Sequence, residues 1–295
     1  MKMSIVNFKT ALIVPLIAMG LLAGCDKPAE QKAVSKPAPS PSTSYLETIK
    51  ARDKLIVGVF SDKPPFGFVN EQGRYVGFDT DLGRRFAKDL LGDETKIEFV
   101  VVEPASRIPF LQSDKVDLIL ANMTVTPERR EAVDFTNPNL RVAVQALVPE
   151  TSTVKSLNDL ADKTIIVTTG TTADIWLTRN HPDWKLLKFE KNSESLQALA
   201  NGRGDAYAQD NLVLFSWARK NPGYRVLEEK LGDEAPIAPA VKKGNTELRD
   251  WVNTELAKLG EEKYLLKLYD QYVRSELADG TDPNAVIVEG GNWKP

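Results

Sequence analysis

Polar side chains that can bind a charged small molecule follow a predicted strand in the first half of the chain. The apolar run Val116–Ala121 predicts that buried strand, which passes directly into Asn122 and Thr124, with Arg129 five residues after Thr124. A guanidinium meets a carboxylate in a two-pronged, charge-assisted geometry. Arg129 is therefore a candidate for binding a carboxylate, although a single arginine more often forms a surface salt bridge.

A second group of polar residues has a similar placement in the second half. Thr171 and Thr172 follow the predicted strand Thr164–Thr168 and open a helix, whose free N–H groups attract anions. Ordinary capping of that helix by threonine is the alternative. Asp210 follows a short strand over Asp205–Ala208 and is a candidate for holding an ammonium group or for an N-cap. An arginine, a helix start and an acid, all at strand ends, together suit a zwitterion.

Signals for an enzyme or a metal site are few. The chain has one histidine, His181, and one cysteine, Cys25. Clusters of metal-binding His and Cys residues and Cys–His nucleophilic sites are therefore excluded, and neither a phosphate-binding P-loop nor a dinucleotide-binding glycine fingerprint occurs. We expect no metal and no cofactor, while a catalytic site made of carboxylates alone stays open.

Strand patterns alternate with helix patterns along the chain, which predicts an α/β protein with mostly parallel sheets. Ligands of such sheets bind at the carboxyl ends of the strands. The apolar runs Val142–Val148 and Ile237–Val241 are candidates for two crossings between the halves. Further strands are predicted over Lys54–Phe60, Lys96–Val102 and Lys185–Phe189, and helices over Asp81–Leu91, Arg107–Gln112, Ser193–Asn201, Asn211–Lys220, Thr246–Lys258 and Glu261–Val273.

The N-terminus has the pattern of an export signal. Lys2 and Lys9 precede a short apolar run that ends in Leu-Leu-Ala-Gly-Cys25, which is typical of a signal peptide cleaved before a cysteine that becomes acylated. Residues 26–44 are rich in Pro, Ser, Lys and Ala, so we expect them to form a flexible tether. Several acyl chains on Cys25 would hold the protein stably at a membrane.

The remaining residues, roughly 250, exceed what one core usually holds, so we expect two lobes. The expected parts are a signal peptide over 1–24, an acylated cysteine and tether over 25–44, a discontinuous first lobe over 45–143 and 241–295, and a second lobe over 144–240. The formal net charge is −3. Because the chain has no basic stripe with interleaved aromatic residues, we expect no nucleic-acid partner.

Several ordered motifs resemble one known family of receptors. The chain is similar to the polar amino-acid-binding family of ABC-transporter solute receptors over roughly residues 46–272. The resemblance rests on Gly77–Leu82, on Val116–Arg129 with Val133–Thr136 after it, on Gly170–Thr172, and on Gly204–Ala206 with Asp210.

The resemblance implies a type II periplasmic-binding-protein-like fold, in which two α/β lobes are joined by two crossing strands and close over the ligand. It implies that Arg129 and Thr172, next to Thr171, hold the α-carboxylate. Thr124 and the Asn122 carbonyl would help to hold the α-ammonium, and Asp210 would neutralise it. Asp79 and Asp81 would be structural. The expected protein is a monomeric lipoprotein on the periplasmic or cell-surface side of a bacterial membrane, whose partners are an ABC permease and its ATPase.

The first loop departs from the family pattern in a way that bears on the ligand. Lys63 stands where many members place an aromatic residue before the Pro-Phe that ends in Phe66, and Ala105 replaces a second aromatic residue. Members that bind aspartate or glutamate place an arginine at the position of Arg107, which Lys63 would assist. Cysteine-binding lipoproteins share longer segments, which are Asp62–Phe66, Gly170–Asp174, Ile237–Gly244 and Glu289–Gly291. We therefore expect cysteine or a similar small polar amino acid first, and aspartate or glutamate second.

Two other classes of protein use the same fold. An enzyme such as a cyclohexadienyl (prephenate or arogenate) dehydratase needs a carboxylate aimed at the leaving hydroxyl and several cations for two carboxylates. No single acid in this sequence stands out for that role. A ligand-sensing domain is the third interpretation.

Overall fold

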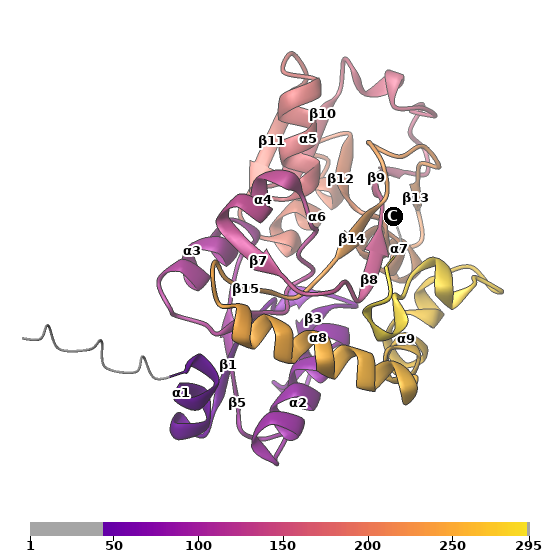
Figure 1. Ribbon diagram of the computed structural model, residues 1–295. Coiled ribbons are helices and arrows are strands. Elements are labelled where there is room, and N and C mark those ends of the chain that lie inside the picture. The colour runs from indigo at the N-terminus through magenta and orange to yellow at the C-terminus, as the bar shows by residue number, and fades with distance from the viewer. Residues whose placement is uncertain (1–43, 294–295) are drawn as a thin grey trace, which may run out of the picture. The chain divides into compact units, whose positions relative to one another are not determined.

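The computed structural model describes residues 44–293, so the predicted signal peptide, Cys25 and nearly all of the tether lie outside the described residues. Two five-stranded sheets organise the described part (Figure 1). We call the elements around the first sheet the first lobe and those around the second sheet the second lobe. In Figure 1, α2 and α8 lie in the first lobe, below, and α5 and α6 lie in the second, above.

The first sheet has the strand order β5-β1-β6-β15-β7. Strand β1 pairs in parallel with β5 and β6, whereas β15 runs antiparallel to β6 and β7. The strands are β1 (Leu55–Val59), β5 (Ile97–Val101), β6 (Leu118–Ile119), β7 (Val133–Phe135) and β15 (Ala240–Lys242). A small antiparallel sheet accompanies them in the first lobe, made of β2 (Asp62–Lys63), β3 (Gly67–Val69) and β4 (Tyr75–Val76).

The second sheet repeats this plan with the order β11-β10-β12-β9-β13. Strand β10 is parallel to β11 and β12, and β9 is antiparallel to β12 and β13. The strands are β9 (Val144–Pro149), β10 (Thr164–Thr168), β11 (Lys185–Phe189), β12 (Ala206–Asp210) and β13 (Tyr224–Val226). Each sheet thus has parallel strands, whose carboxyl ends share one edge, and an antiparallel strand that arrives from the other lobe.

Two short strands connect the lobes. Strands β8 (Leu140–Val142) and β14 (Ala235–Ile237) form a two-stranded antiparallel sheet, and the chain continues from them into β9 and β15. The sequence predicted each crossing as a single strand. The first is interrupted at Ala143, and the second is interrupted at Ala238 and Pro239, where proline has no N–H to donate to a ladder.

Apolar residues of the strands alternate between two faces of each sheet. Val57 and Leu118 belong to one buried cluster and Ile119 to another, and the same alternation separates Ile165 from Ile166. Helices cover these faces. They are α1 (Tyr45–Arg52), α2 (Phe78–Leu91), α3 (Arg107–Gln112), α4 (Pro127–Ala132), α5 (Thr172–Asn180), α6 (Asn192–Ala200), α7 (Asn211–Lys220), α8 (Thr246–Glu261) and α9 (Tyr264–Tyr272).

The two-lobed α/β fold expected from the sequence is confirmed, with shifts at several ends. Helix α2 begins at Phe78 rather than at Asp81, because Gly77 at its N-cap has a φ of 126° that glycine tolerates well. The predicted strand Val116–Ala121 contributes only Leu118–Ile119 to the sheet. Helix α1 was not predicted, although Ser44 caps it by accepting from the Glu47 N–H. Within residues 44–293, no helix is both long and apolar enough to cross a membrane.

Candidate functional site

Asp210 is the acid at the centre of the candidate site. It ends β12 at the N-cap position of α7, but its carboxylate makes no capping hydrogen bond. Instead Oδ2 accepts from Asn122 Nδ2 of the first lobe at 2.7 Å, and Oδ1 accepts from Thr172 Oγ1 at 3.4 Å. Asp210 is only 2% exposed. Asp210 thus occupies the N-cap position, as one of the two alternatives had it, but its carboxylate does not cap the helix and instead faces the contact between the lobes.

Lys63, in the first loop, faces the same carboxylate. Its Nζ lies 3.7 Å from Asp210 Oδ2 and 5.1 Å from the centre of the Phe60 ring. The side chain is almost completely buried. Burial lowers the pKa of Lys63 to about 8, because the attraction of Asp210 offsets only part of the desolvation and Arg107 adds a repulsion. The sequence indicated a cation here, and the structure places it beside the acid.

Arg107, the first residue of α3, donates hydrogen bonds from its guanidinium to backbone carbonyls. Its Nε donates to the Pro104 carbonyl at 3.0 Å, and its Nη1 donates to the carbonyls of Ala121 and Asn122 at 3.0 and 3.1 Å. The residue is 3% exposed. Burial, helped by the charge of Arg129, lowers the pKa of Arg107 well below its usual range. These contacts hold the turn that follows β6.

Asn122 occupies that turn in a left-handed conformation, with a φ of 42°. Its N–H donates to Asp79 Oδ2 at 2.8 Å, and its carbonyl accepts from Arg107. Burial raises the pKa of Asp79 to about 6, although this hydrogen bond works in the opposite direction. Asp79 therefore positions the Asn122 backbone. The Asn122 side-chain oxygen, Oδ1, is buried and has no hydrogen-bond partner among the described residues.

Arg129, on α4, joins the two lobes. Its Nη1 donates to the Thr124 carbonyl at 2.7 Å and its Nη2 donates to the Gly170 carbonyl of the second lobe at 3.0 Å. Burial lowers its pKa to about 10. Arg129 is buried and forms no salt bridge among the described residues, so the alternative role in a surface salt bridge is wrong. The neighbouring Glu128 pairs with Arg179 at 2.8 Å.

The two threonines that open α5 have different roles. Thr171 caps the helix, since its Oγ1 accepts from the Asp174 N–H at 3.3 Å and donates to the Thr168 carbonyl at 2.7 Å. Thr172 instead directs its hydroxyl toward Asp210. The capping alternative thus accounts for the hydroxyl of Thr171, whereas the hydroxyl of Thr172 faces Asp210.

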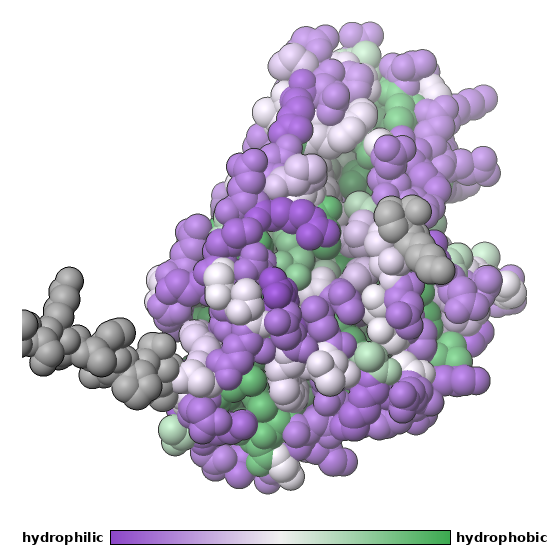
Figure 2. Space-filling view, in the orientation of Figure 1, coloured by the Kyte–Doolittle hydropathy of each residue, from purple (hydrophilic) through white to green (hydrophobic). Residues whose placement is uncertain are grey.

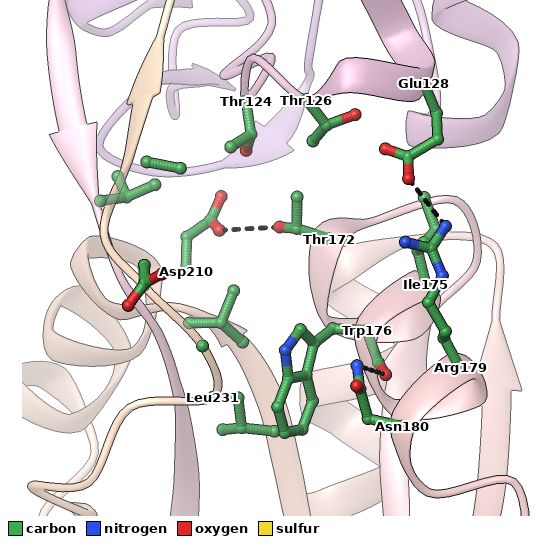
Figure 3. Close-up of a pocket in the computed structure, with 15 residues that line it drawn as sticks. Thr124, Thr126, Glu128, Thr172, Ile175, Trp176, Arg179, Asn180, Asp210 and Leu231 are labelled. Carbon is green, nitrogen blue, oxygen red and sulfur yellow. Dashed lines mark hydrogen bonds and ion pairs between the residues drawn. The ribbon is translucent and has the colours of Figure 1, made fainter. Parts of the chain in front are cut away.

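A cavity of about 310 Å³ lies between the lobes beside Asp210 (Figure 3). Thr124 and Thr126 line it from the first lobe, and Asp210 and Thr172 line it from the second. Glu128 and Arg179 approach each other at one side. Apolar side chains contribute to the lining, and they are Val142, Val144, Ile175, Trp176, Leu231 and Ala235, while Asn180 and Asp233 add polar groups. Figure 2 shows hydrophobic surface in the hollow between mostly hydrophilic surfaces of the lobes.

The other sequence candidates lie around this cavity. Arg107 and Arg129 line a neighbouring cavity of about 350 Å³, which shares Glu128 and Ile175 with the first. Lys63 and Asn122 are buried next to Asp210. Phe66 has no exposed surface and packs in the core of the first lobe. Phe66 is thus placed among core residues and lines neither cavity.

Trp176 and the Glu128–Arg179 pair were not among the candidates from the sequence. Trp176 lies one turn after Thr172 on α5, a spacing of four residues that puts both side chains on one helix face. That spacing was a usable signal for Trp176. No such signal exists for Glu128 and Arg179, because they meet only when the lobes are in contact. No group of His, Cys, Asp or Glu within residues 44–293 has the arrangement of a metal site.

The chain is similar to known proteins over most of its length. A model of the family described as bacterial extracellular solute-binding proteins, family 3, matches residues 55–275. An ABC transporter glutamine-binding protein of Bacillus subtilis is 34% identical over 92% of this chain and 98% of its own length. Crystal structures of a cysteine-binding protein from Campylobacter jejuni and of a solute receptor for L-cysteine from Neisseria gonorrhoeae are each 44% identical. Both cover 83% of this chain and 99% of their own, with TM-scores of 0.82 and 0.81.

Proposed function

Because the chain belongs to the bacterial extracellular solute-binding proteins of family 3, we propose that it captures a small polar L-amino acid outside the cytoplasm and delivers it to an ABC importer. The family supplies amino acids to such transporters, and the chain is a binding protein rather than an enzyme. The dehydratase alternative is therefore not retained.

The observation that carries the proposal is the burial of two opposite charges where the lobes meet. Asp210 is 2% exposed and Arg129 is 5% exposed, and each contacts the opposite lobe. A zwitterion brings an ammonium group for Asp210 and a carboxylate for Arg129, and hydrogen bonds to charged groups are strong. The hydroxyls of Thr124 and Thr172 add neutral donors and acceptors beside them.

Two observations support cysteine as the first candidate ligand. The receptors with the highest identity among those above are described as binding cysteine. In addition, Arg107 donates to three backbone carbonyls through Nε and Nη1, which leaves only the Nη2 end of its guanidinium for a second carboxylate. Arg107 was the residue expected to bind the side-chain carboxylate of aspartate or glutamate, so these two amino acids rank below cysteine as candidate ligands.

Closure of the lobes over the ligand is the proposed mechanism. Strands β8 and β14 connect the lobes by only two chain segments, which gives the fold a natural hinge. A ligand that contacts both lobes favours the closed population by its difference in affinity for the two states. The lobes are in contact in the structure, as the Asp62 carboxylate accepts from the Ser193 N–H at 2.9 Å across them.

Attachment to a membrane through Cys25 is proposed from the N-terminal pattern alone. We propose a monomer that is acylated at Cys25 and tethered by residues 26–44, so that the lobes reach the permease while staying at the membrane.

Calorimetric titration of the protein with each of the twenty common amino acids and with cystine tests the proposal. We expect one small polar amino acid to bind most tightly, with L-cysteine ahead of aspartate and glutamate. Tightest binding of aspartate or glutamate would reverse the ranking of ligands. Binding of none of them would contradict the proposed function itself.

A further inference from the structure

Asn122 is held more firmly than a residue at a strand end requires. An asparagine with a φ of 42° is in the left-handed region, which costs free energy for residues other than glycine, although asparagine tolerates it best. Both of its backbone polar groups are fixed by buried charged side chains from two other elements. Asp79 of α2 accepts from the N–H, and Arg107 of α3 donates to the carbonyl.

This backbone conformation directs the side chain to the acid of the second lobe. Asn122 Nδ2 donates to Asp210 Oδ2 at 2.7 Å. An ionised carboxylate only accepts hydrogen bonds, so the end of the amide that faces it must be the NH₂ group. The other end, Oδ1, is consequently an acceptor.

That oxygen has no partner among the described residues, although it is buried and Asn122 is 2% exposed. A buried acceptor without a donor is unfavourable, and such groups are rare in folded proteins. Because Oδ1 and Nδ2 belong to one planar amide, Oδ1 lies next to the atom that contacts Asp210. Lys63 Nζ, which lies 3.7 Å from the same carboxylate oxygen, does not donate to Oδ1, so the acceptor is left for another donor beside Asp210.

From this geometry we propose that the Asn122 side-chain oxygen accepts a hydrogen bond from the ammonium group of the ligand, and that Arg107 and Asp79 are positioning residues that act through Asn122. The inference rests on the proposed amino-acid site. It assigns Arg107 to the group shared by all amino acids rather than to a side-chain carboxylate. It also adds the side-chain oxygen of Asn122 as an acceptor beside the backbone carbonyl, one lone pair of which already accepts from Arg107.

A double-mutant cycle measured by calorimetric titration of the full chain with L-cysteine tests the proposal. Asn122→Gly removes the acceptor, and glycine adopts a positive φ without support. We expect this variant to bind at least about tenfold more weakly, as for loss of a hydrogen bond to a charged group. In the wild-type background, Arg107→Met should weaken the affinity for L-cysteine by a similar factor. In the Asn122→Gly background it should weaken the affinity by less than about threefold, because residue 122 then has no side chain for Arg107 to position.

Controls separate this effect from general damage. Arg130→Met changes an exposed arginine on α4 and should leave the affinity unchanged. If Arg107→Met does not fold, Arg107→Lys replaces it in the cycle, since an ammonium cannot hold three carbonyls in the geometry of a guanidinium. Thermal unfolding of each variant checks folding.

The inference would be overturned if Arg107→Met lowered the affinity by the same factor in both backgrounds. It would also be overturned if Asn122→Gly bound the amino acid as tightly as the wild type. Asn122→Gly should also weaken every amino acid that the wild type binds by a similar factor, because all share the ammonium group. If the protein binds another amino acid but not cysteine, the same cycle is measured with that amino acid. Binding of none contradicts the proposed function, whereas binding with additive losses contradicts only this inference.

Discussion

Lys63 and Asp210 come from opposite lobes and bring Nζ and Oδ2 to within 3.7 Å of each other, with both side chains almost completely buried. A buried ion pair gains attraction but loses the solvation of both charges. The lowered pKa of Lys63, about 8, indicates that for the ammonium group the loss is larger than the gain. Asp210 additionally holds Asn122 and Thr172, so it is supported by neutral donors as well.

The pH dependence of stability should reveal the cost of burying Lys63. The pKa of Lys63 falls from 10.5 in its ordinary state to about 8 in the folded protein, so between these values the unfolded chain binds more protons than the folded one. Stability therefore rises with pH through this window. The shift corresponds to about 3 kcal/mol.

Lys63→Met isolates this contribution, because the other titrating groups are common to both proteins. We expect the free energy of unfolding of the wild type, relative to that of Lys63→Met, to increase between pH 8 and pH 10.5. Denaturant titrations at several pH values measure it. Parallel pH profiles of the two proteins would show that Lys63 keeps its ordinary pKa in the folded state.

Ligand binding should change the distribution of lobe positions. Arg129 and Thr124 lie on the first lobe, and Thr172 and Asp210 lie on the second. A ligand that bridges them pulls the population toward the closed form. Small-angle scattering of the protein should show a smaller radius of gyration on adding saturating L-cysteine, or whichever amino acid the calorimetric panel identifies. An unchanged radius at confirmed saturation would count against closure.

Acylation should depend on Cys25 alone. The chain has no other cysteine, so Cys25→Ser should leave an unprocessed precursor that takes up no labelled fatty acid when expressed in bacteria. Wild-type protein provides the matched control in the same labelling experiment. Normal maturation and labelling of the variant would mean that the export interpretation of the N-terminus is wrong.

The sequence predicted the elements of the fold better than their ends. Alternating patterns located the sheets and the helices that follow them, because burial of one face imposes a period on the chain. The ends of the two connecting strands were not predicted, because the apolar runs Val142–Val148 and Ile237–Val241 each continue from a connecting strand into a sheet. Periodicity does not reveal the interruptions at Ala143 and Pro239.

Individual roles in the site were harder to predict. The choice between capping and ligand contact at Thr171, Thr172 and Asp210 depends on side-chain direction, which sequence spacing does not determine. The role of Arg107 depends on the carbonyls of Ala121 and Asn122, fourteen and fifteen residues later. Such contacts form only when Asn122, in the turn after β6, adopts its left-handed conformation. Asparagine tolerates this conformation, but its presence in a sequence does not predict it.

The central claim is that Arg129 binds the carboxylate of an amino acid between the lobes. Truncating one partner of a buried, charged hydrogen-bonded pair leaves the other charge without compensation. Arg129→Ala should therefore cost about 3 kcal/mol or more of binding free energy, on the order of a hundredfold in affinity. Some stability should also be lost, because Arg129 donates to the carbonyls of Thr124 and Gly170.

Titration of folded Arg129→Ala with the amino acid that the wild type binds most tightly is the most direct measurement. Arg130→Ala, which alters the exposed neighbour on the same helix, provides the matched control and should bind normally. We predict at least about a hundredfold loss of affinity for Arg129→Ala. Near-normal affinity of that variant would contradict the account, because it would leave the ligand carboxylate without its proposed partner.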